Sequence, residues 1–134
     1  MKTPSDTMNN AKTILVIDDE PENRRIYREI LSDLGYRVID KPDGASALSD
    51  IQQGEKIDLV ITDYKMPGMN GLELATILRN MLPSIPVLML TAYANIDNYI
   101  QSLSLGVFEY IIKPVGRIEF IRIVRMALND KPAC

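Results

Sequence analysis

The chain has 134 residues, of which 46% are hydrophobic and 25% charged, a composition that fits one globular domain. Its 15 basic residues stand against 18 acidic ones, so the sequence excludes binding to nucleic acid by charge alone. It contains no histidine, which excludes histidine metal ligands, histidine bases and a phosphohistidine within this chain.

The opening residues are polar and lack the apolar stretch of a signal peptide, and no apolar run is long enough to cross a bilayer. The single cysteine, Cys134, has no partner for an internal disulfide. We therefore expect a cytoplasmic protein that does not enter a membrane. The expected division is a flexible tail at 1–11, one domain at 12–130 and a short tail at 131–134.

Short apolar runs alternate along the chain with helical repeats of apolar residues. Runs such as 57–63 are rich in β-branched residues, which predicts strands buried on both faces of a sheet. Pro21 suits the first turn of a helix, and Gly35 and Gly106 suit helix ends. The expected elements are a strand at 13–17, a helix at 21–34, a strand at 36–39, a helix at 43–54, a strand at 57–63, a helix at 71–82, a strand at 86–90, a helix at 95–105, a strand at 108–112 and a helix at 116–129.

This alternation predicts an α/β fold, a doubly wound parallel sheet of five strands with helices on both faces, as in flavodoxin. We expect the strand order 2-1-3-4-5, which reverses between the first and third strands and so creates a site for ligands there. In the helix at 95–105, the apolar residues Ile96, Ile100 and Leu103 are expected on the inner side.

Four of the expected strands end in polar residues. Asp18 and Asp19 follow the first strand, Asp63 the third, Thr91 the fourth and Lys113 the fifth. Because parallel strands point their carboxyl ends at one edge of a sheet, these side chains should meet in space. Taken singly, each has an ordinary explanation, and an Asp pair before a helix is most often an N-cap. Together they predict a site in which Asp63 is a phosphoryl acceptor.

The carboxylates of this site require a counter-charge. Three carboxylates within about 5 Å repel one another by roughly 3 kcal/mol per pair at an effective dielectric near 20. A hard divalent cation removes that repulsion, and ligands that are all oxygen favour Mg²⁺. Magnesium is therefore the expected cofactor.

The whole pattern resembles the receiver domain of two-component response regulators, from about residue 13 to residue 129. The residues that carry the resemblance are Asp18-Asp19, Asp63 with Met66-Pro67 and Gly71, Thr91-Ala92, and Lys113-Pro114. The resemblance implies a signalling switch rather than an enzyme, with only weak autophosphorylation and autodephosphorylation. The phosphoryl group would come from a sensor histidine kinase or a phosphotransfer protein, and hydrolysis of the aspartyl phosphate would reset the switch.

The resemblance also implies a role for each site residue. The implied metal ligands are Asp19, Asp63 and the backbone carbonyl of Lys65, with Asp18 acting through water. Thr91 and Lys113 would hold the phosphoryl oxygens, and Thr91 with Tyr110 would form the switch that alters the surface of the last two helices and the strand between them. The positions implied to tune the rates are those of Lys65 and Tyr93.

Apolar residues on the last helix exceed what is needed to seat it on the sheet. Phe120, Val124, Ala127 and Leu128 already form one apolar stripe. The excess indicates either a deeply seated helix or an interface for a second copy or an output partner. The candidate interface residues are Tyr99, Ile112, Ile118, Ile121 and Met126.

Three other functions fit parts of the pattern. A phosphatase of the haloacid dehalogenase type also uses an aspartyl phosphate, but it requires a second aspartate where this chain has Lys65. A flavodoxin-like FMN protein would cradle a phosphate in its first loop, where Asp18-Asp19-Glu20 would repel it. A pseudo-receiver would keep the fold and lose site residues, whereas this sequence keeps them.

Overall fold

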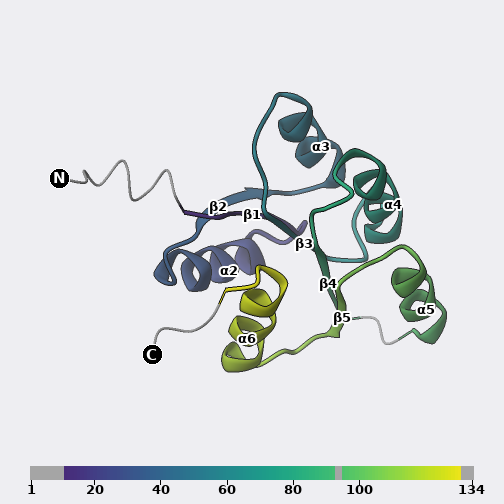
Figure 1. The fold of residues 1–134 in the computed structure, drawn as a ribbon. Helices are drawn as coiled ribbons and strands as arrows, with labels where there is room; N and C mark the ends of the chain where they lie inside the picture. Colours follow the sequence, from purple (N-terminus) through teal and green to yellow (C-terminus); the bar gives the residue numbers. More distant parts are fainter. Residues whose placement is uncertain (1–10, 93–94, 131–134) are drawn as a thin grey trace.

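The computed structural model describes residues 11–92 and 95–130, in which strands and helices alternate (Figure 1). In chain order the elements are β1 Thr13–Ile17, α2 Pro21–Asp33, β2 Arg37–Lys41, α3 Gly44–Gln52, β3 Leu59–Thr62, α4 Gly71–Met81, β4 Val87–Thr91, α5 Ile96–Ser104, β5 Glu109–Ile112 and α6 Arg117–Ala127. All ten predicted elements are present, although β2 extends beyond its predicted end and β3 is shorter than predicted. Tyr93, Cys134 and nearly all of the predicted tails lie outside the described residues.

The strands form one parallel sheet in the order β2-β1-β3-β4-β5, which confirms the predicted doubly wound topology. At the carboxyl end of β1, Ile17 lies opposite Lys41 of β2 and Thr62 of β3. The strand order reverses between β1 and β3, so the residues that follow Ile17 and Thr62 emerge side by side.

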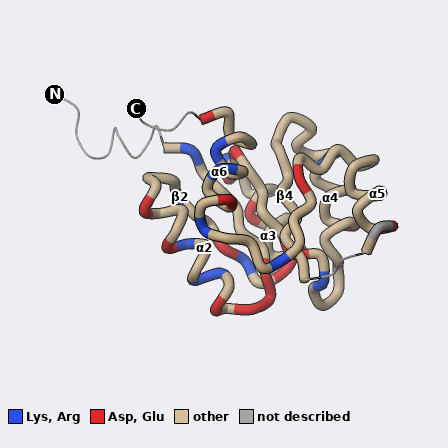
Figure 2. Tube along the Cα trace, turned by 90° about the horizontal axis from the view of Figure 1, so that it is seen from below, with Lys and Arg blue, Asp and Glu red and all other residues tan. Residues whose placement is uncertain are grey.

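Charge is distributed unevenly over the helices. Figure 2 shows acidic and basic segments close together on α2, whereas the chain of α4 and α5 is mostly uncharged. On α2, Arg25 pairs with Glu22 and, at 2.8 Å, with Glu29, and these exposed pairs contribute little to stability. None of the helices among the described residues has the length and apolar content needed to cross a membrane.

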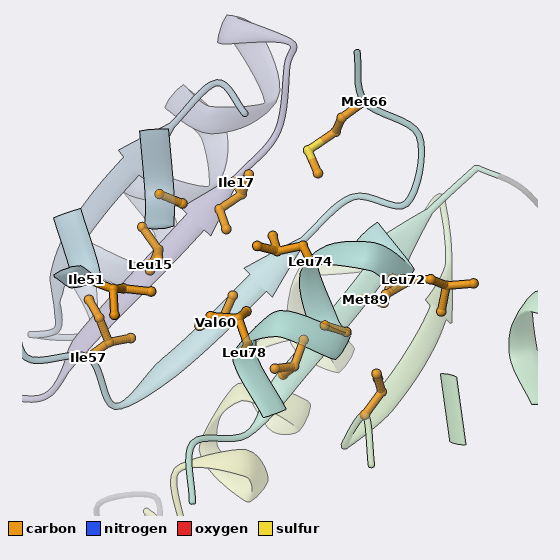
Figure 3. Packing of buried hydrophobic residues seen from close by; sticks show 14 of the residues in the cluster. Leu15, Ile17, Ile51, Ile57, Val60, Met66, Leu72, Leu74, Leu78 and Met89 are labelled. Carbon is orange, nitrogen blue, oxygen red and sulfur yellow. The ribbon is translucent and has the colours of Figure 1, made fainter. Parts of the chain in front are cut away.

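Each face of the sheet has its own core. Leu15 and Ile17 of β1 face α3 and α4, whereas Ile14 and Val16 face α2 and α6, as expected from the alternation of side chains along a strand. Figure 3 shows the side chains of Leu15, Val60, Leu74 and Leu78 in the core between the sheet and the helices α3 and α4. Each fully buried leucine contributes roughly 2 kcal/mol, so burial on both faces stabilises the sheet that positions the strand ends.

The predicted inner side of α5 is wrong. Ile100 and Leu103 are 55% and 49% exposed, whereas Ser102 is fully buried. The Ser102 hydroxyl donates a hydrogen bond to the carbonyl of Tyr99 at 2.7 Å, so a small polar residue can be buried there without an unsatisfied group. Ile100 and Leu103, whose spacing predicted an inner face, therefore lie on the outer face of α5. The side chain of Ile96, the third predicted residue, lies outside what the structure describes.

Candidate functional site

Two of the acidic residues in the loop after β1, Asp18 and Asp19, lie in different environments. Asp18 is buried and Asp19 is exposed. The backbone N–H of Asp18 continues the β1–β2 ladder by donating to the carbonyl of Lys41 at 3.2 Å. The Asp18 carboxylate accepts hydrogen bonds from the N–H of Glu20 at 2.9 Å and from the amide of Asn23 at 3.3 Å. The loop is therefore fixed through both the backbone and the side chain of Asp18.

Asp63 follows β3 and is anchored to the strand beside it. Its N–H donates to the carbonyl of Ile17 at 3.0 Å, and its carboxylate accepts from the N–H of Tyr64 at 2.7 Å. The loop that follows folds back so closely that a Cβ at Gly71 would lie 2.4 Å from the carbonyl oxygen of Asp63. Glycine is required at this position, and α4 begins there with a capping box between Asn70 and Glu73.

Lys113 joins the carboxylates from the end of β5. Its backbone N–H donates to the carbonyl of Thr91 at 2.8 Å. Its Nζ atom lies 3.2 Å from Oδ2 of Asp18 and 3.4 Å from Oδ2 of Asp63. Carboxylate oxygens of Asp18, Asp19 and Asp63 all lie within 4.8 Å of one another. The structure therefore brings together the carboxylates and the amine that the sequence placed at the ends of three strands, β1, β3 and β5.

Burial and charge shift the pKa values of these groups. Burial raises the pKa of Asp63; the Lys113 ammonium opposes this effect and the Asp18 carboxylate adds to it. Burial alone would lower the pKa of Lys113, but the negative charges of Asp18 and Asp63, with a contribution from Tyr27, raise it overall. The pKa of Asp63 is raised overall, so its charged form is disfavoured, and a cation that offsets the carboxylate charge would be favoured here.

The site opens into a cleft of about 530 Å³. Its lining includes Asp19, Asp63, Lys65 and Lys113, together with Ala92 from the end of β4. Thr91, the residue before Ala92, is fully buried. Lys65, predicted as a metal ligand through its carbonyl, therefore lies at the cleft, and Thr91 lies next in sequence to a cleft residue.

Tyr110 and the candidate interface residues lie further from the cleft. Tyr110 is buried and packs edge-on against Tyr99, with ring centroids 5.7 Å apart. The predicted interface residues Tyr99, Ile112, Ile118 and Met126 are exposed, and Ile118 is the most exposed of them, at 85%. Ile121 is half-buried and packs partly against the core under α6. Four of the five candidate interface residues are therefore exposed, and their role as an interface stays a prediction.

Sequence reasoning missed two residues in the first turns of α2. Asn23 donates to the Asp18 carboxylate, and the Arg24 guanidinium donates to the Asp18 carbonyl at 2.7 Å. The only signal in the sequence is the position of two polar residues shortly after an acidic loop.

Comparison with known proteins identifies the family. The family model described as "Response regulator receiver domain" matches residues 14–125. The chain belongs to this family. The receiver domain is 39% identical over 110 residues to the chemotaxis protein CheY-3 of Vibrio cholerae, covering 80% of this chain and 84% of that protein. It is 37% identical over 102 residues to the transcriptional regulatory protein ZraR of Klebsiella oxytoca, where it spans only 23% of the relative's length.

Solved structures agree with the family. A CheY-like receiver domain protein from Methanospirillum hungatei superposes with a TM-score of 0.86 at 30% identity, covering 90% of this chain and 95% of that one. The response regulator TrrA of Thermotoga maritima, solved in complex with Mg(2+)-BeF, gives a TM-score of 0.79 at 35% identity and covers 87% of this chain and 99% of that one. This chain is thus a two-component receiver domain of the CheY-like type.

Proposed function

We propose that this receiver domain is a phosphorylation-dependent switch that accepts a phosphoryl group on Asp63 from a partner histidine kinase or phosphotransfer protein. The observation that carries the proposal is the position of Lys113, whose Nζ atom lies within 3.4 Å of both Asp18 and Asp63 at the mouth of an open cleft. A positive charge beside a nucleophilic carboxylate is what phosphoryl transfer requires.

The transfer needs a nucleophile and neutralisation of the phosphoryl oxygens. An Asp63 oxygen attacks the phosphorus of a phosphohistidine, the P–N bond breaks, and its electron pair stays on the imidazole, which takes up a proton. The product is an acyl phosphate on Asp63. The Lys113 ammonium and the Thr91 hydroxyl would then hold the transferred oxygens. In the reset, water attacks the phosphorus, the P–O bond to Asp63 breaks, and inorganic phosphate leaves.

The donor set fits Mg²⁺. Three carboxylates supply only oxygen ligands, which are the ligands of a hard divalent cation, and their oxygens lie within 4.8 Å of one another. Asp19, Asp63 and the backbone carbonyl of Lys65 would hold the ion directly, and Asp18 would act through water. When bound, Mg²⁺ supplies charge neutralisation for the carboxylates and the phosphoryl oxygens. The Mg(2+)-BeF complex of the similar TrrA supports this assignment.

The signal leaves the site through the neighbouring elements. Thr91, at the end of β4, lies opposite Ile112 of β5, two residues beyond Tyr110. Thr91 and Tyr110 would change position when Asp63 carries phosphate, and the exposed apolar surface of α5, β5 and α6 would change with them. A second copy or an output partner would bind there, and Lys65 and Tyr93 would adjust the rates.

The test is phosphorylation by a small acyl phosphate in the presence of MgCl₂, measured by intact mass. We expect a single added phosphate on the wild type and none on Asp63→Asn. The matched control is Asp58→Asn, which removes a carboxylate at the opposite edge of the sheet and should be phosphorylated like the wild type. Tyrosine fluorescence in the same samples should change only where phosphate is added, because Tyr99 and Tyr110 are in contact.

Two results would overturn the proposal. One is a wild type that takes up no phosphate, or takes it up at a residue other than Asp63. The other is repeated turnover of unrelated phosphomonoesters, which would identify a phosphatase instead.

A further inference from the structure

Arg24 on α2 contacts the acidic loop of the site without facing the cleft. Its Nη1 atom donates to the backbone carbonyl of Asp18 at 2.7 Å, and its Nε atom lies 3.4 Å from Oδ2 of Asp40 on β2. The Arg24 side chain is only 18% exposed, so the guanidinium is largely shielded from solvent. A shielded guanidinium with two fixed partners holds a defined geometry.

The carbonyl that Arg24 binds belongs to the peptide unit between Asp18 and Asp19. A peptide unit is planar and rigid, so the direction of this carbonyl fixes the direction in which the chain enters Asp19. The Asp18 carboxylate has side-chain and backbone donors of its own, from Glu20, Asn23 and Lys113. Asp19 is exposed, and its orientation depends on the peptide unit that precedes it.

The same contact links the loop to the neighbouring strand. The N–H of Asp18 donates to the carbonyl of Lys41, and Arg24 pairs with Asp40, the residue before Lys41. The loop and the end of β2 are therefore joined twice, once through the sheet ladder and once through the Arg24 side chain. Asp40 is held in turn by Arg28, at 2.6 Å, on the solvent side of α2.

We infer that Arg24 is a positioning residue that orients Asp19 toward Asp63 and so sets the affinity of this site for a divalent cation. The inference rests on the proposed function, because it concerns the cation that the carboxylates would share. Arg24 does not touch the reacting atoms, and its effect passes through the Asp18–Asp19 peptide unit.

Charge and geometry predict opposite effects of removing Arg24. If the guanidinium acted only as a charge, it would repel a cation, and Arg24→Ala would bind Mg²⁺ more tightly than the wild type. If it orients the ligand, Arg24→Ala binds Mg²⁺ more weakly, by about tenfold, which is the lower end of the effect of losing an outer-shell partner.

The experiment is calorimetric titration of the whole chain with MgCl₂, with the melting temperature of each variant measured alongside. The control is Arg28→Ala, which removes an arginine of the same helix that binds the same Asp40 carboxylate and is 45% exposed. We expect Arg28→Ala to bind Mg²⁺ like the wild type, Arg24→Ala about tenfold more weakly, and Arg24→Lys in between, because lysine keeps the charge and can keep only one of the two contacts.

A second readout separates positioning from loss of fold. The rate of phosphorylation of Arg24→Ala should recover as MgCl₂ is raised, so that the half-saturating magnesium concentration rises while the maximal rate changes less. A destabilised fold would not recover in this way. If Arg24→Ala does not fold, weaker binding by Arg24→Lys than by Arg28→Ala carries the inference, and equal binding overturns it.

The two proposals fail in different ways. Mg²⁺ affinity of folded Arg24→Ala that equals or exceeds that of the wild type overturns the role of Arg24, even if Asp63 is phosphorylated normally. A wild type that binds Mg²⁺ but takes up no phosphate on Asp63 overturns the switch and leaves the role of Arg24 in cation binding intact. A wild type that binds no Mg²⁺ overturns the Arg24 inference.

Discussion

Carboxylates gather both where the parallel strands end, at the carboxyl edge of the sheet, and where they begin, at its amino edge. Their negative charge is balanced differently at the two. At the carboxyl edge, oxygens of three carboxylates lie within 4.8 Å of one another, and the Lys113 ammonium lies beside two of them, Asp18 and Asp63. At the amino edge, the described residues form no such cluster of three carboxylates, and the hydrogen-bond donors offset the carboxylate charge. The contacts there are Asp58 with the N–H of Thr13 at 2.8 Å, Asp130 with Lys12 at 2.7 Å and Asp130 with the Tyr36 hydroxyl at 2.8 Å.

The pKa values follow this difference. Burial raises the pKa of Asp63, and Lys113 does not fully offset it. Burial alone would also raise the pKa of Asp130, but hydrogen bonds from Lys12 and Tyr36 lower it overall. The amino edge therefore contributes stability, whereas the carboxyl edge keeps an excess of negative charge that disfavours the folded state until a cation or a phosphoryl group changes it.

The largest change in stability should come from the amino edge. Asp58 precedes β3. Its carboxylate accepts the hydrogen bond from the backbone N–H of the buried residue Thr13. Asp58→Ala leaves that N–H without an acceptor, so we expect the free energy of unfolding to fall by about 2 kcal/mol. Urea denaturation followed by circular dichroism measures this change.

The control for this prediction is Asp58→Asn, which keeps an oxygen acceptor and removes the charge. Its stability should stay within about 0.5 kcal/mol of the wild type, because the hydrogen bond rather than the charge is what Thr13 requires. Equal losses in Asp58→Ala and Asp58→Asn would show that charge matters at this edge too.

A mutation at the carboxyl edge should have the opposite sign. Without metal, Asp63→Asn removes one of the crowded charges, so we expect the free energy of unfolding to rise by roughly 1–2 kcal/mol and the melting temperature by several degrees. Thermal unfolding in the presence of a chelator measures the effect. An unchanged or lower melting temperature would mean that Lys113 already neutralises the cluster.

The pH dependence of stability tests independently whether the charge of Asp63 destabilises the folded state. Because the pKa of Asp63 is higher in the folded than in the unfolded chain, the folded state binds more protons in the window between the two values. Wild-type stability is therefore reduced as pH rises through this window and stays reduced above it. The advantage of Asp63→Asn should be full at neutral pH and should disappear as pH falls to about 4, the pKa of an unperturbed aspartate.

The sequence predicted the carboxyl edge better than the faces of the helices. Parallel strands leave no choice about which ends meet, so the placement of Asp18, Asp63 and Lys113 followed from where each strand stops. The inner face of α5 did not follow, because Ile100 and Leu103 keep helical spacing whether the helix buries them or exposes them. Burial of Ser102 depends on a hydrogen bond that spacing cannot reveal.

Contacts that depend on the conformation of one side chain could not be predicted from the sequence either. Arginine is common on exposed helix faces, and nothing in the order of residues indicates that Arg24 turns toward the carbonyl of Asp18. The contact between Lys12 and Asp130 joins residues at opposite ends of the domain, and it depends on α6 returning to the start of β1. The sequence thus predicts what backbone topology imposes, and it misses what one side-chain conformation decides.

The smallest effect should come from Asp130, and its pH dependence should run opposite to that of Asp63. The pKa of Asp130 is lowered in the folded chain, so its stabilising effect is present above the unfolded value near 4 and is lost as pH falls through the folded value. Asp130 and Lys12 are partly exposed, so we expect Asp130→Asn to lower the free energy of unfolding by about 0.5–1 kcal/mol at pH 7. Burial and the Asp130 carboxylate raise the pKa of Tyr36 to about 12, so its hydroxyl remains a donor over the whole range.

Urea denaturation at several pH values should show the wild-type advantage over Asp130→Asn shrinking toward acid pH. An advantage that instead grew toward acid pH would place Asp130 in the same electrostatic class as Asp63 and would remove the contrast between the two edges.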